Sequence, residues 1–546
     1  MHVSRIAMAT FLSLFVGVTA VQAAPRPNDP FYALQWTFGP AKKYGMDVLR
    51  AWDFSRGKGV VVAVVDSGFI GTRYYPDFDK RILPGYDFVS DSTEAGDGDG
   101  RDSDPTDPGD RCEDENPKWH GTQVANVIAA TANNRIATAG IAPQSQVIFV
   151  RALGKCFAYS DDISDAIRWS AGLSVAGVPD NQHPAKVINV SLGGTEPGAC
   201  YEQGAIDQAV AAGSIVVVAA GNQNAPAESF GPSNCNNVIS VAATDGRGFR
   251  SPYSNYGPSV DISAPTNGTT NGQGSCQDPA IGPNFKSKQG PVKLSKTYYV
   301  CMNGTSFAAP LVSGMLALAA SFDPSTSSAD LLTLMGANVT RFGGSTDVNP
   351  CLSLTECGLG IASAGKMLVA MSKRPAPLLT LTSSMTVEAG GTVGIEYAIT
   401  EPDGTPLGEV AATLTSLTTE ACSVDGWLLT SITADDCRIR VRTSGTVRMA
   451  PKSFDFTINQ VGIDAEANVS FTPEMKTKST QVVSATSLAD TWSLTSSSKL
   501  VCKVLRLDPL RYKVTSLKKG KCTLRADFVA SGSYEDTSLA FSIQVR

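Results

Sequence analysis

The feature that most constrains the fold is an alternation of short apolar runs with helix-like segments between Gly59 and about Ala370. The runs have strand length and are largely apolar, which is typical of strands buried on both faces of a sheet. Strand, helix, strand in this order predicts a doubly wound α/β fold, with a mostly parallel sheet between two layers of helices. The predicted strands are 60–65, 147–150, 187–190 and 215–219, and the predicted helices are 121–131, 162–173, 206–212 and 311–320.

The composition changes after the linker-like stretch Ser372–Pro377. Helical periodicity disappears there, and Thr, Ser and Val dominate. The sequences around Cys422 and Cys437 are echoed weakly around Cys502 and Cys522, which predicts two small all-β, immunoglobulin-like sandwich modules, each closed by one disulfide. We expect four segments: an amino-terminal segment 1–24, the α/β domain 25–377, a first β module 378–462 and a second β module 463–546.

The first 24 residues resemble a secretory signal peptide: Arg5 precedes an apolar stretch from Ile6 to Val21 and a small-residue exit. A membrane anchor is the alternative, but the stretch is short and Pro25 and Pro27 follow it at once. No later uncharged segment reaches spanning length. We therefore expect an exported, extracellular protein with no membrane span.

Export predicts that the twelve cysteines form disulfide bonds, because disulfides persist in oxidising compartments. Metal binding is the alternative, but the chain has no C-x-x-C pair and only two histidines follow the signal. The clustering suggests the pairs Cys200 with Cys235, Cys276 with Cys301, Cys351 with Cys357, Cys422 with Cys437 and Cys502 with Cys522, leaving Cys112 with Cys156.

Charge narrows the choice of partners. The formal net charge of −6 argues against nucleic acid, which needs a strongly basic face. From Ile463 onward, however, twelve Lys and Arg stand against eight Asp and Glu, a net of +4. The second β module could touch an anionic surface, although scattered surface lysines explain the excess more simply.

Histidine is scarce, which narrows the search for a general base near neutral pH to His120 and His183. His183 lies in a polar loop and is expected to be exposed. His120 opens a predicted helix, where Gly121 leaves room for close approach. Asp66 ends the first predicted strand, and its carboxylate needs a partner there: an Asx turn with the next residues, or an imidazole N–H.

Ser306 directly precedes the predicted helix 311–320 and has two interpretations. It could be an N-cap, or a nucleophile whose backbone N–H helps to hold an oxyanion at the positive end of the helix. The small residues Gly304, Ala308 and Ala309 favour the nucleophile. Asn222 follows the strand 215–219, and its amide could also donate to an oxyanion or could simply form a turn.

Five segments taken in order resemble the motifs of the subtilisin-like serine peptidase family. They are Asp66-Ser67-Gly68, His120-Gly121-Thr122, Ser191-Leu192-Gly193-Gly194, Ala219-Ala220-Gly221-Asn222 and Gly304-Thr305-Ser306-Phe307-Ala308-Ala309-Pro310. The order Asp, His, Ser separates this family's triad from those of two other folds. The resemblance covers roughly Pro25 to Ala370 and points to extracellular peptidases of Gram-negative bacteria.

The resemblance implies a subtilisin-like fold for 25–377 and a secreted serine endopeptidase that forms an acyl-enzyme on Ser306. The resemblance also implies the role of each residue: Asp66 orients His120, and His120 takes the proton of Ser306. Asn222 and the Ser306 N–H would form the oxyanion hole. The enzyme would be a monomer that cleaves proteins or peptides with broad specificity, and its chemistry would need no cofactor. Substrate contacts and an apolar P1 pocket are expected from Ser191, Leu192, Gly193, Ala219, Ala220 and Gly221.

The loop 97–110 is dense in carboxylates and could bind a structural calcium ion through Asp97, Asp99, Asp102 and Asp104. It does not match an EF-hand, and a merely solvated acidic loop is the alternative. The family generally carries a folding-assisting propeptide, for which Ala24–Lys58 is too short, so we expect folding without one or with help from the β modules.

Two other functions stay open on the sequence. One is a protease-derived adhesin, in which the catalytic domain is vestigial, although none of the expected catalytic residues is lost. The other is a narrowly specific processing protease, which would have an acidic P1 pocket that grips basic residues.

Overall fold

The computed structural model describes residues 26–546 apart from 110–118, 196–197, 199, 267–279, 285–297, 345–350, 352–355, 383–385, 389–390, 403–404, 408–409, 411, 433–436, 445, 447–448, 451, 462–467, 471–473, 477, 487–490, 509–510 and 530–536. The predicted signal peptide 1–24 therefore lies outside the described residues, as do Cys112 and Cys276.

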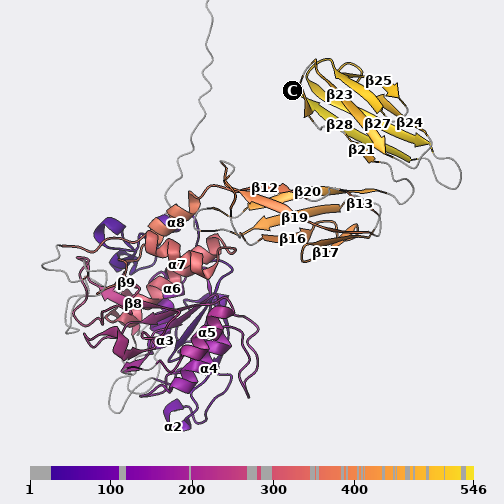
Figure 1. Cartoon of the computed structure of the whole chain (residues 1–546). Helices are drawn as coiled ribbons and strands as arrows, with labels where there is room; N and C mark the ends of the chain where they lie inside the picture. Colours follow the sequence, from indigo (N-terminus) through magenta and orange to yellow (C-terminus); the bar gives the residue numbers. More distant parts are fainter. Residues whose placement is uncertain are drawn as a thin grey trace, which may run out of the picture. The chain divides into compact units, whose positions relative to one another are not determined.

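A seven-stranded, wholly parallel sheet forms the centre of the α/β domain (Figure 1). Its order is β2-β3-β1-β4-β6-β8-β9: after β1 the chain forms the edge strand β2, returns to place β3 between β2 and β1, and then adds β4, β6, β8 and β9 on the other side of β1. The carboxyl end of β1 is thus a topological switch point, where ligands of open α/β sheets bind. The strands are β1 Val61–Asp66, β2 Ile82–Asp87, β3 Gln146–Arg151, β4 Val187–Val190, β6 Ile215–Ala219, β8 Val238–Thr244 and β9 Ile262–Pro265.

Alternate residues of the strands face two separate hydrophobic cores, because successive side chains point to opposite faces of a sheet. Val62 and Val64 of β1 pack in the core that contains α3 (His120–Ala129) and α6 (Thr305–Phe322). Ala63 and Val65 pack in the core that contains α4 (Ser160–Ser170) and α5 (Gln203–Ala211). Helices therefore cover both faces, and the predicted doubly wound fold is confirmed.

Observed element bounds agree closely with the predicted ones, with one exception that matters for the site. The strands predicted at 187–190 and 215–219 are β4 and β6, with the same bounds. Helix α6, in contrast, begins at Thr305 rather than Leu311. Its N-cap residue is Gly304, so Ser306 lies in the first turn, and the N-cap interpretation of Ser306 was wrong. α6 is apolar enough to cross a membrane by composition, but 83% of it is buried in the protein, as expected of a core helix.

Smaller elements surround this core. Helix α8 packs with α1 and α6, while the short antiparallel pair β5 and β7 lies beyond the end of β4. The bounds are α1 Val48–Ala51, α2 Ser92–Ala95, α7 Ser328–Ala337, α8 Ala364–Ser372, β5 Gly194–Thr195, β7 Phe230–Gly231, β10 Ala280–Asn284 and β11 Tyr298–Met302.

The carboxyl-terminal part of the chain is all β. Its first group of strands is β12 Leu378–Leu381, β13 Thr386–Glu388, β14 Thr392–Gly394, β15 Tyr397–Thr400, β16 Ala412–Ser416, β17 Cys422–Asp425, β18 Leu428–Ser431, β19 Cys437–Thr443 and β20 Lys452–Val461. The second group is β21 Asn468–Ser470, β22 Glu474–Met475, β23 Thr480–Thr486, β24 Thr491–Ser496, β25 Cys502–Asp508, β26 Arg511–Ser516, β27 Gly520–Val529 and β28 Thr537–Val545. Each group has its own hydrophobic core.

Four of the predicted disulfides are present: Cys200–Cys235, Cys351–Cys357, Cys422–Cys437 and Cys502–Cys522. In each β module the bond joins strands of different sheets, β17 to β19 and β25 to β27, through sulfurs in the buried core. Cys156 is also disulfide-bonded. The proposed partners Cys112 and Cys276 lie outside the described residues.

The two compact units of the chain differ in part from the domains that the sequence predicts. One unit ends at Ala376 but also contains Ser444–Pro451, and the other comprises Pro377–Thr443 and Lys452–Arg546. Within the first unit, the buried Arg374 pairs with Asp323 at 2.7 Å and donates to the carbonyl oxygen of Thr446 at 2.5 Å. The stretch predicted as a linker is therefore anchored at Arg374.

The buried carboxyl group of Asp77 accepts hydrogen bonds from the hydroxyl of Tyr75 at 3.1 Å and from Asn134 at 2.6 Å. Burial raises the pKa of Asp77 from 3.8 to about 8, although both hydrogen bonds lower it. Between these two pH values the folded state holds a proton that the unfolded chain has released. The free energy of unfolding must therefore fall as the pH rises through this range.

We predict that Asp77→Asn flattens the pH dependence of the melting temperature between about pH 5 and about pH 8. The measurement is thermal unfolding followed by circular dichroism, with Asp99→Asn as an exposed control. Equal slopes in the Asp77 and Asp99 variants would contradict the account.

Candidate active site

Asp66 and His120 are brought together at the switch point of the sheet. Asp66, the last residue of β1, is completely buried, and its Oδ1 lies 2.8 Å from Nδ1 of His120. The same oxygen accepts from the backbone N–H of Ser67 at 2.8 Å. Of the two partners proposed from the sequence, the imidazole is therefore present, while the backbone contact is made to the next residue, Ser67, and is not an Asx turn. The contact commits Nδ1 of His120 to the carboxylate, so proton transfer by this ring would use Nε2.

The first turn of α3 packs against the turn that follows β1, which fixes the position of His120. A side chain at Gly121 would place Cβ 2.5 Å from the carbonyl oxygen of Gly68, so only glycine allows this approach. The Gly121 N–H donates to the hydroxyl of Ser67 at 3.0 Å. The imidazole is 20% exposed and lies against Phe307 in the first turn of α6, with ring centroids 5.6 Å apart. His183, in contrast, is exposed, as predicted.

Asn222 caps α6 from outside the helix. Its Oδ1 accepts from the backbone N–H of Thr305 at 2.8 Å and from the Thr305 hydroxyl at 3.1 Å. A backbone N–H can only donate, so the amide oxygen must face Thr305 and the NH₂ group must point away from the cap. Gly304, the N-cap residue, has φ +123° and no side chain to cap the helix. Asn222 replaces that missing cap, which orients its amide.

Ser306 follows directly and is held through its backbone. Its carbonyl oxygen accepts from the hydroxyl of Ser191 at 2.9 Å. Buried Asn189 of β4 donates to the same hydroxyl at 2.8 Å and accepts from Ser313 of α6 at 2.9 Å. This polar network ties the first three turns of α6 to the end of β4. The Ser306 N–H donates to no atom of the described residues, so it is free to bind a ligand.

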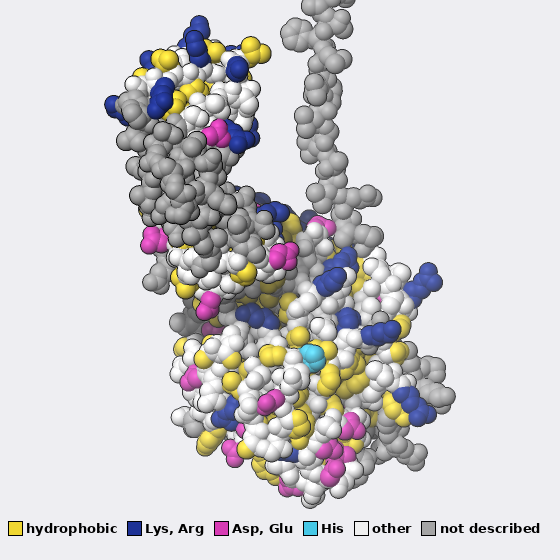
Figure 2. Space-filling view, turned by 90° about the vertical axis from the view of Figure 1, so that its right-hand side faces the viewer, with side chains coloured by type: hydrophobic (Ala, Val, Ile, Leu, Met, Phe, Trp, Pro, Cys, Tyr) yellow, Lys and Arg dark blue, Asp and Glu magenta, His cyan; other side chains and the backbone are white. Residues whose placement is uncertain are grey.

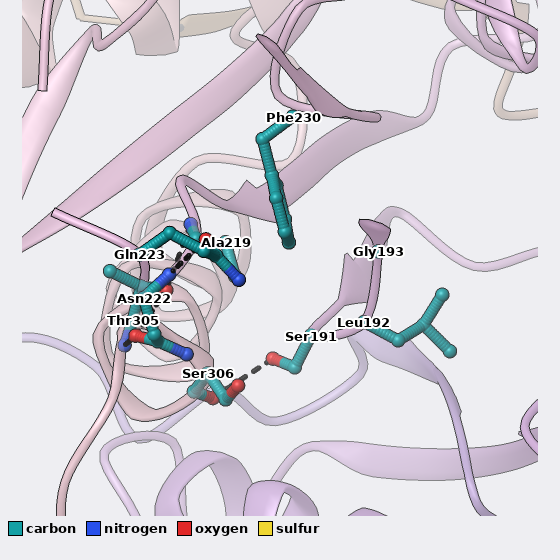
Figure 3. A pocket seen from close by; sticks show the side chains of 10 residues that line it. Ser191, Leu192, Gly193, Ala219, Asn222, Gln223, Phe230, Thr305 and Ser306 are labelled. Carbon is teal, nitrogen blue, oxygen red and sulfur yellow. Dashed lines mark hydrogen bonds between the residues drawn. The ribbon is translucent and has the colours of Figure 1, made fainter. Parts of the chain in front are cut away.

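A cavity of about 140 Å³ lies beside Ser306, with Asn222 and Thr305 on one side and Ser191, Leu192 and Gly193 on the other (Figure 3). Gly221, Ala219, Gln223 and Phe230 complete its lining. Five of the six residues predicted to contact the substrate thus lie together. Ala220 does not: its side chain is buried with Ala227, Ala242 and Val260, because neighbouring residues of an extended segment point to opposite sides.

Phe230 is the lining residue that the sequence did not predict. It reaches the cavity because β5 and β7 pair, with Thr195 opposite Phe230. Its ring leaves no room for side chains at two neighbouring positions: a Cβ would lie 2.9 Å from the ring at both Gly193 and Gly221. These glycines sit at φ +156° and +103°. Among the residues described, none that lines the cavity is charged.

Comparison with known proteins agrees with this geometry. The Subtilase family model matches residues 57–360, more than half of the chain. The chain belongs to the subtilase family. It is 42% identical over 347 residues to an extracellular basic protease of Dichelobacter nodosus, covering 59% of this chain and 53% of that protein. It is 38% identical over 403 residues to an extracellular protease of Xanthomonas campestris pv. campestris, covering 70% of this chain and 65% of that protein.

A solved structure of a protease from Pseudoalteromonas arctica superposes with a TM-score of 0.58 at 37% identity, covering 63% of this chain and 99% of that one. This subtilase spans only about half to two thirds of the length of the two bacterial relatives above. The similarity therefore establishes the family and its α/β fold.

The predicted calcium loop of this subtilase does not assemble a ligand set. Asp97 forms an ion pair with buried Arg151 at 2.6 Å, Asp102 accepts from the N–H of Asp104 at 2.7 Å, and Asp104 accepts from the hydroxyl of Thr106 at 2.5 Å. Over the described part of the chain, the one group of His, Cys, Asp and Glu close enough to share a metal is Cys200, Glu202 and Cys235. Its two sulfurs form a disulfide. Among the described residues of the loop, Asp97, Asp99, Asp102 and Asp104 thus do not converge on one point, and a calcium ion there stays a prediction.

Proposed function

We propose that this subtilase is a secreted serine endopeptidase that hydrolyses peptide bonds through an acyl-enzyme on Ser306. The observation that carries the proposal is the buried Asp66–His120 pair, held at 2.8 Å where β1 ends, beside the first turn of α6 that bears Ser306. The extracellular proteases among its relatives and the four disulfides support secretion.

In the proposed mechanism the Ser306 hydroxyl attacks the substrate carbonyl while Nε2 of His120 takes its proton. The Asp66 carboxylate keeps the other proton on Nδ1 and stabilises the imidazolium that forms. His120 then gives its proton to the leaving amine, and the acyl group remains on Ser306. A water molecule, activated by the same imidazole, releases the acid and restores the hydroxyl.

The oxyanion is proposed to bind between the Asn222 amide and the Ser306 backbone N–H. Two features support this role: the cap contact turns the amide NH₂ away from Thr305, and the Ser306 N–H lies at the positive end of α6. Donors fixed in advance stabilise developing charge without the cost of reorientation. The capping contact thus uses the amide oxygen of Asn222, and the proposed catalytic contact uses the amide nitrogen of the same side chain.

The cavity is proposed to hold the P1 side chain. Its volume of about 140 Å³ is close to that of an engineered apolar cavity of about 150 Å³ that binds benzene. Leu192, Ala219 and Phe230 give it apolar walls, while Ser191, Asn222, Gln223 and Thr305 contribute polar ones. A medium-sized apolar P1 residue suits this space, and the absence of an acid from the described lining argues against a processing protease selective for basic residues.

We predict that purified protein cleaves unfolded protein and that Ser306→Ala lowers kcat on the order of 10⁶-fold. Asn222→Ala should lower kcat by about 10²- to 10³-fold, the loss seen for one oxyanion donor of a subtilisin, with little change in KM. The assay is cleavage of a fluorogenic peptide library, with His183→Ala as the control histidine. Comparable cleavage by wild type and Ser306→Ala would refute the proposal and favour an adhesin.

Phe230 should limit the size of the P1 side chain. We predict that Phe230→Ala raises kcat/KM for P1 Tyr or Trp relative to P1 Leu by roughly tenfold or more, because each added methylene in a fitted pocket changes discrimination by about 10- to 200-fold. Phe54→Ala, which removes an aromatic ring outside the lining, is the matched control. An unchanged ratio in the Phe230 variant would show that another wall sets the P1 preference.

A further inference from the structure

Three loops of the second β module meet at one end of its sheets. The N–H of Leu517, after β26, donates to the carbonyl oxygen of Val501, before β25, at 2.8 Å. The hydroxyl of Ser516 donates to the carbonyl oxygen of Lys476, before β23, at 2.7 Å. The described residues of the loops before β23, before β25 and after β26, namely 476, 478–479, 497–501 and 517–519, therefore lie side by side.

Lysine dominates the exposed surface of these loops. We call the following residues the basic tip: Lys476, Lys478, Lys499, Lys518, Lys519 and Lys521. All six are exposed. The one acid in or directly beside the three loops, Glu474, is paired with Arg546. Dark blue Lys and Arg side chains are prominent on the described part of this module, at the top of Figure 2.

Two leucines project among these lysines. Leu500 is 77% exposed and Leu517 is 44% exposed. Leu500 follows Lys499 directly, and Leu517 precedes Lys518. The tip thus combines positive charge with uncovered aliphatic side chains at the same three loops.

The fold does not require this combination, because the first module builds the same turns without it. There the N–H of Ile432 donates to the carbonyl oxygen of Ala421 at 2.8 Å, as Leu517 does to Val501. Counted from the paired cysteines, Glu420 stands where Leu500 does, and Asp436 stands where Lys521 does. The first module also exposes an aliphatic side chain at the position of Leu517, because Ile432 is 53% exposed, so the positive charge around the aliphatic residues is what distinguishes the second module.

We propose that the basic tip docks the protein on an anionic lipid surface. Lysines near a membrane gain from the negative potential of phosphate head groups, by about fivefold in affinity per residue. Leu500 and Leu517 would enter the boundary between head groups and acyl chains, which is where amphipathic surface proteins bury their apolar side chains. An acidic polysaccharide would use the lysines but would leave both leucines in water, so the lipid surface accounts for more of the site.

The test uses the full-length chain with Ser306→Ala and measures cosedimentation with phosphatidylcholine vesicles, with or without phosphatidylglycerol. We expect binding to the anionic vesicles only. Lys499→Gln/Lys518→Gln/Lys519→Gln should weaken it on the order of 100-fold. Leu500→Gln, which changes no charge, should weaken it roughly threefold or more.

The matched control is Lys42→Gln/Lys43→Gln/Lys58→Gln, which removes the same charge from exposed lysines of the α/β domain and should leave binding unchanged. Circular dichroism verifies that each variant is folded. Absence of binding to anionic vesicles, or equal losses in the two triple variants, would overturn the proposal. Binding to dextran sulfate with no effect of Leu500→Gln on vesicle binding would assign the tip to a polyanion instead.

Discussion

The hydrogen bond between Asp66 and His120 is the constraint on which the arrangement of the site depends. A completely buried carboxylate at the end of a strand is costly unless it is paired, and here it receives the imidazole and a backbone N–H on one oxygen. The pairing forces α3 against the turn after β1, which in turn requires glycine at position 121. The Asp66–His120 contact therefore determines how β1, the turn that follows it and α3 pack together.

The second constraint is the start of α6. Gly304 gives the chain the conformation that turns it into the helix, but glycine cannot cap it. Asn222 supplies the cap from the end of β6, while Asn189 ties Ser313 and the hydroxyl of Ser191 to the end of β4. Because Asn189 lies near the end of β4 and Asn222 follows β6, the sheet sets the position of Ser306 through polar contacts made at its carboxyl edge.

Much of this could be predicted from the sequence because it is local. Apolar runs of strand length fixed β4 and β6 to the residue, and the scarcity of histidine singled out His120. Other features depend on contacts between distant residues. Phe230 enters the cavity only because β7 pairs with β5, and the loop Ser444–Pro451 groups with the α/β domain although it lies between two strands of a β module. The sequence of the acidic loop also could not show that Asp97 pairs with the distant Arg151, or that Asp102 accepts from the N–H of Asp104.

Covalent labelling of Ser306 tests the central claim most directly. An alkyl fluorophosphonate reacts only with a serine hydroxyl whose proton can be removed, so it reports the Asp66–His120–Ser306 unit before any substrate is chosen. The account predicts one adduct per chain, located at Ser306 by peptide mass spectrometry, and a labelling rate that falls at least about 10³-fold in His120→Ala. Equal labelling of wild type and His120→Ala, or an adduct on another residue, would contradict it.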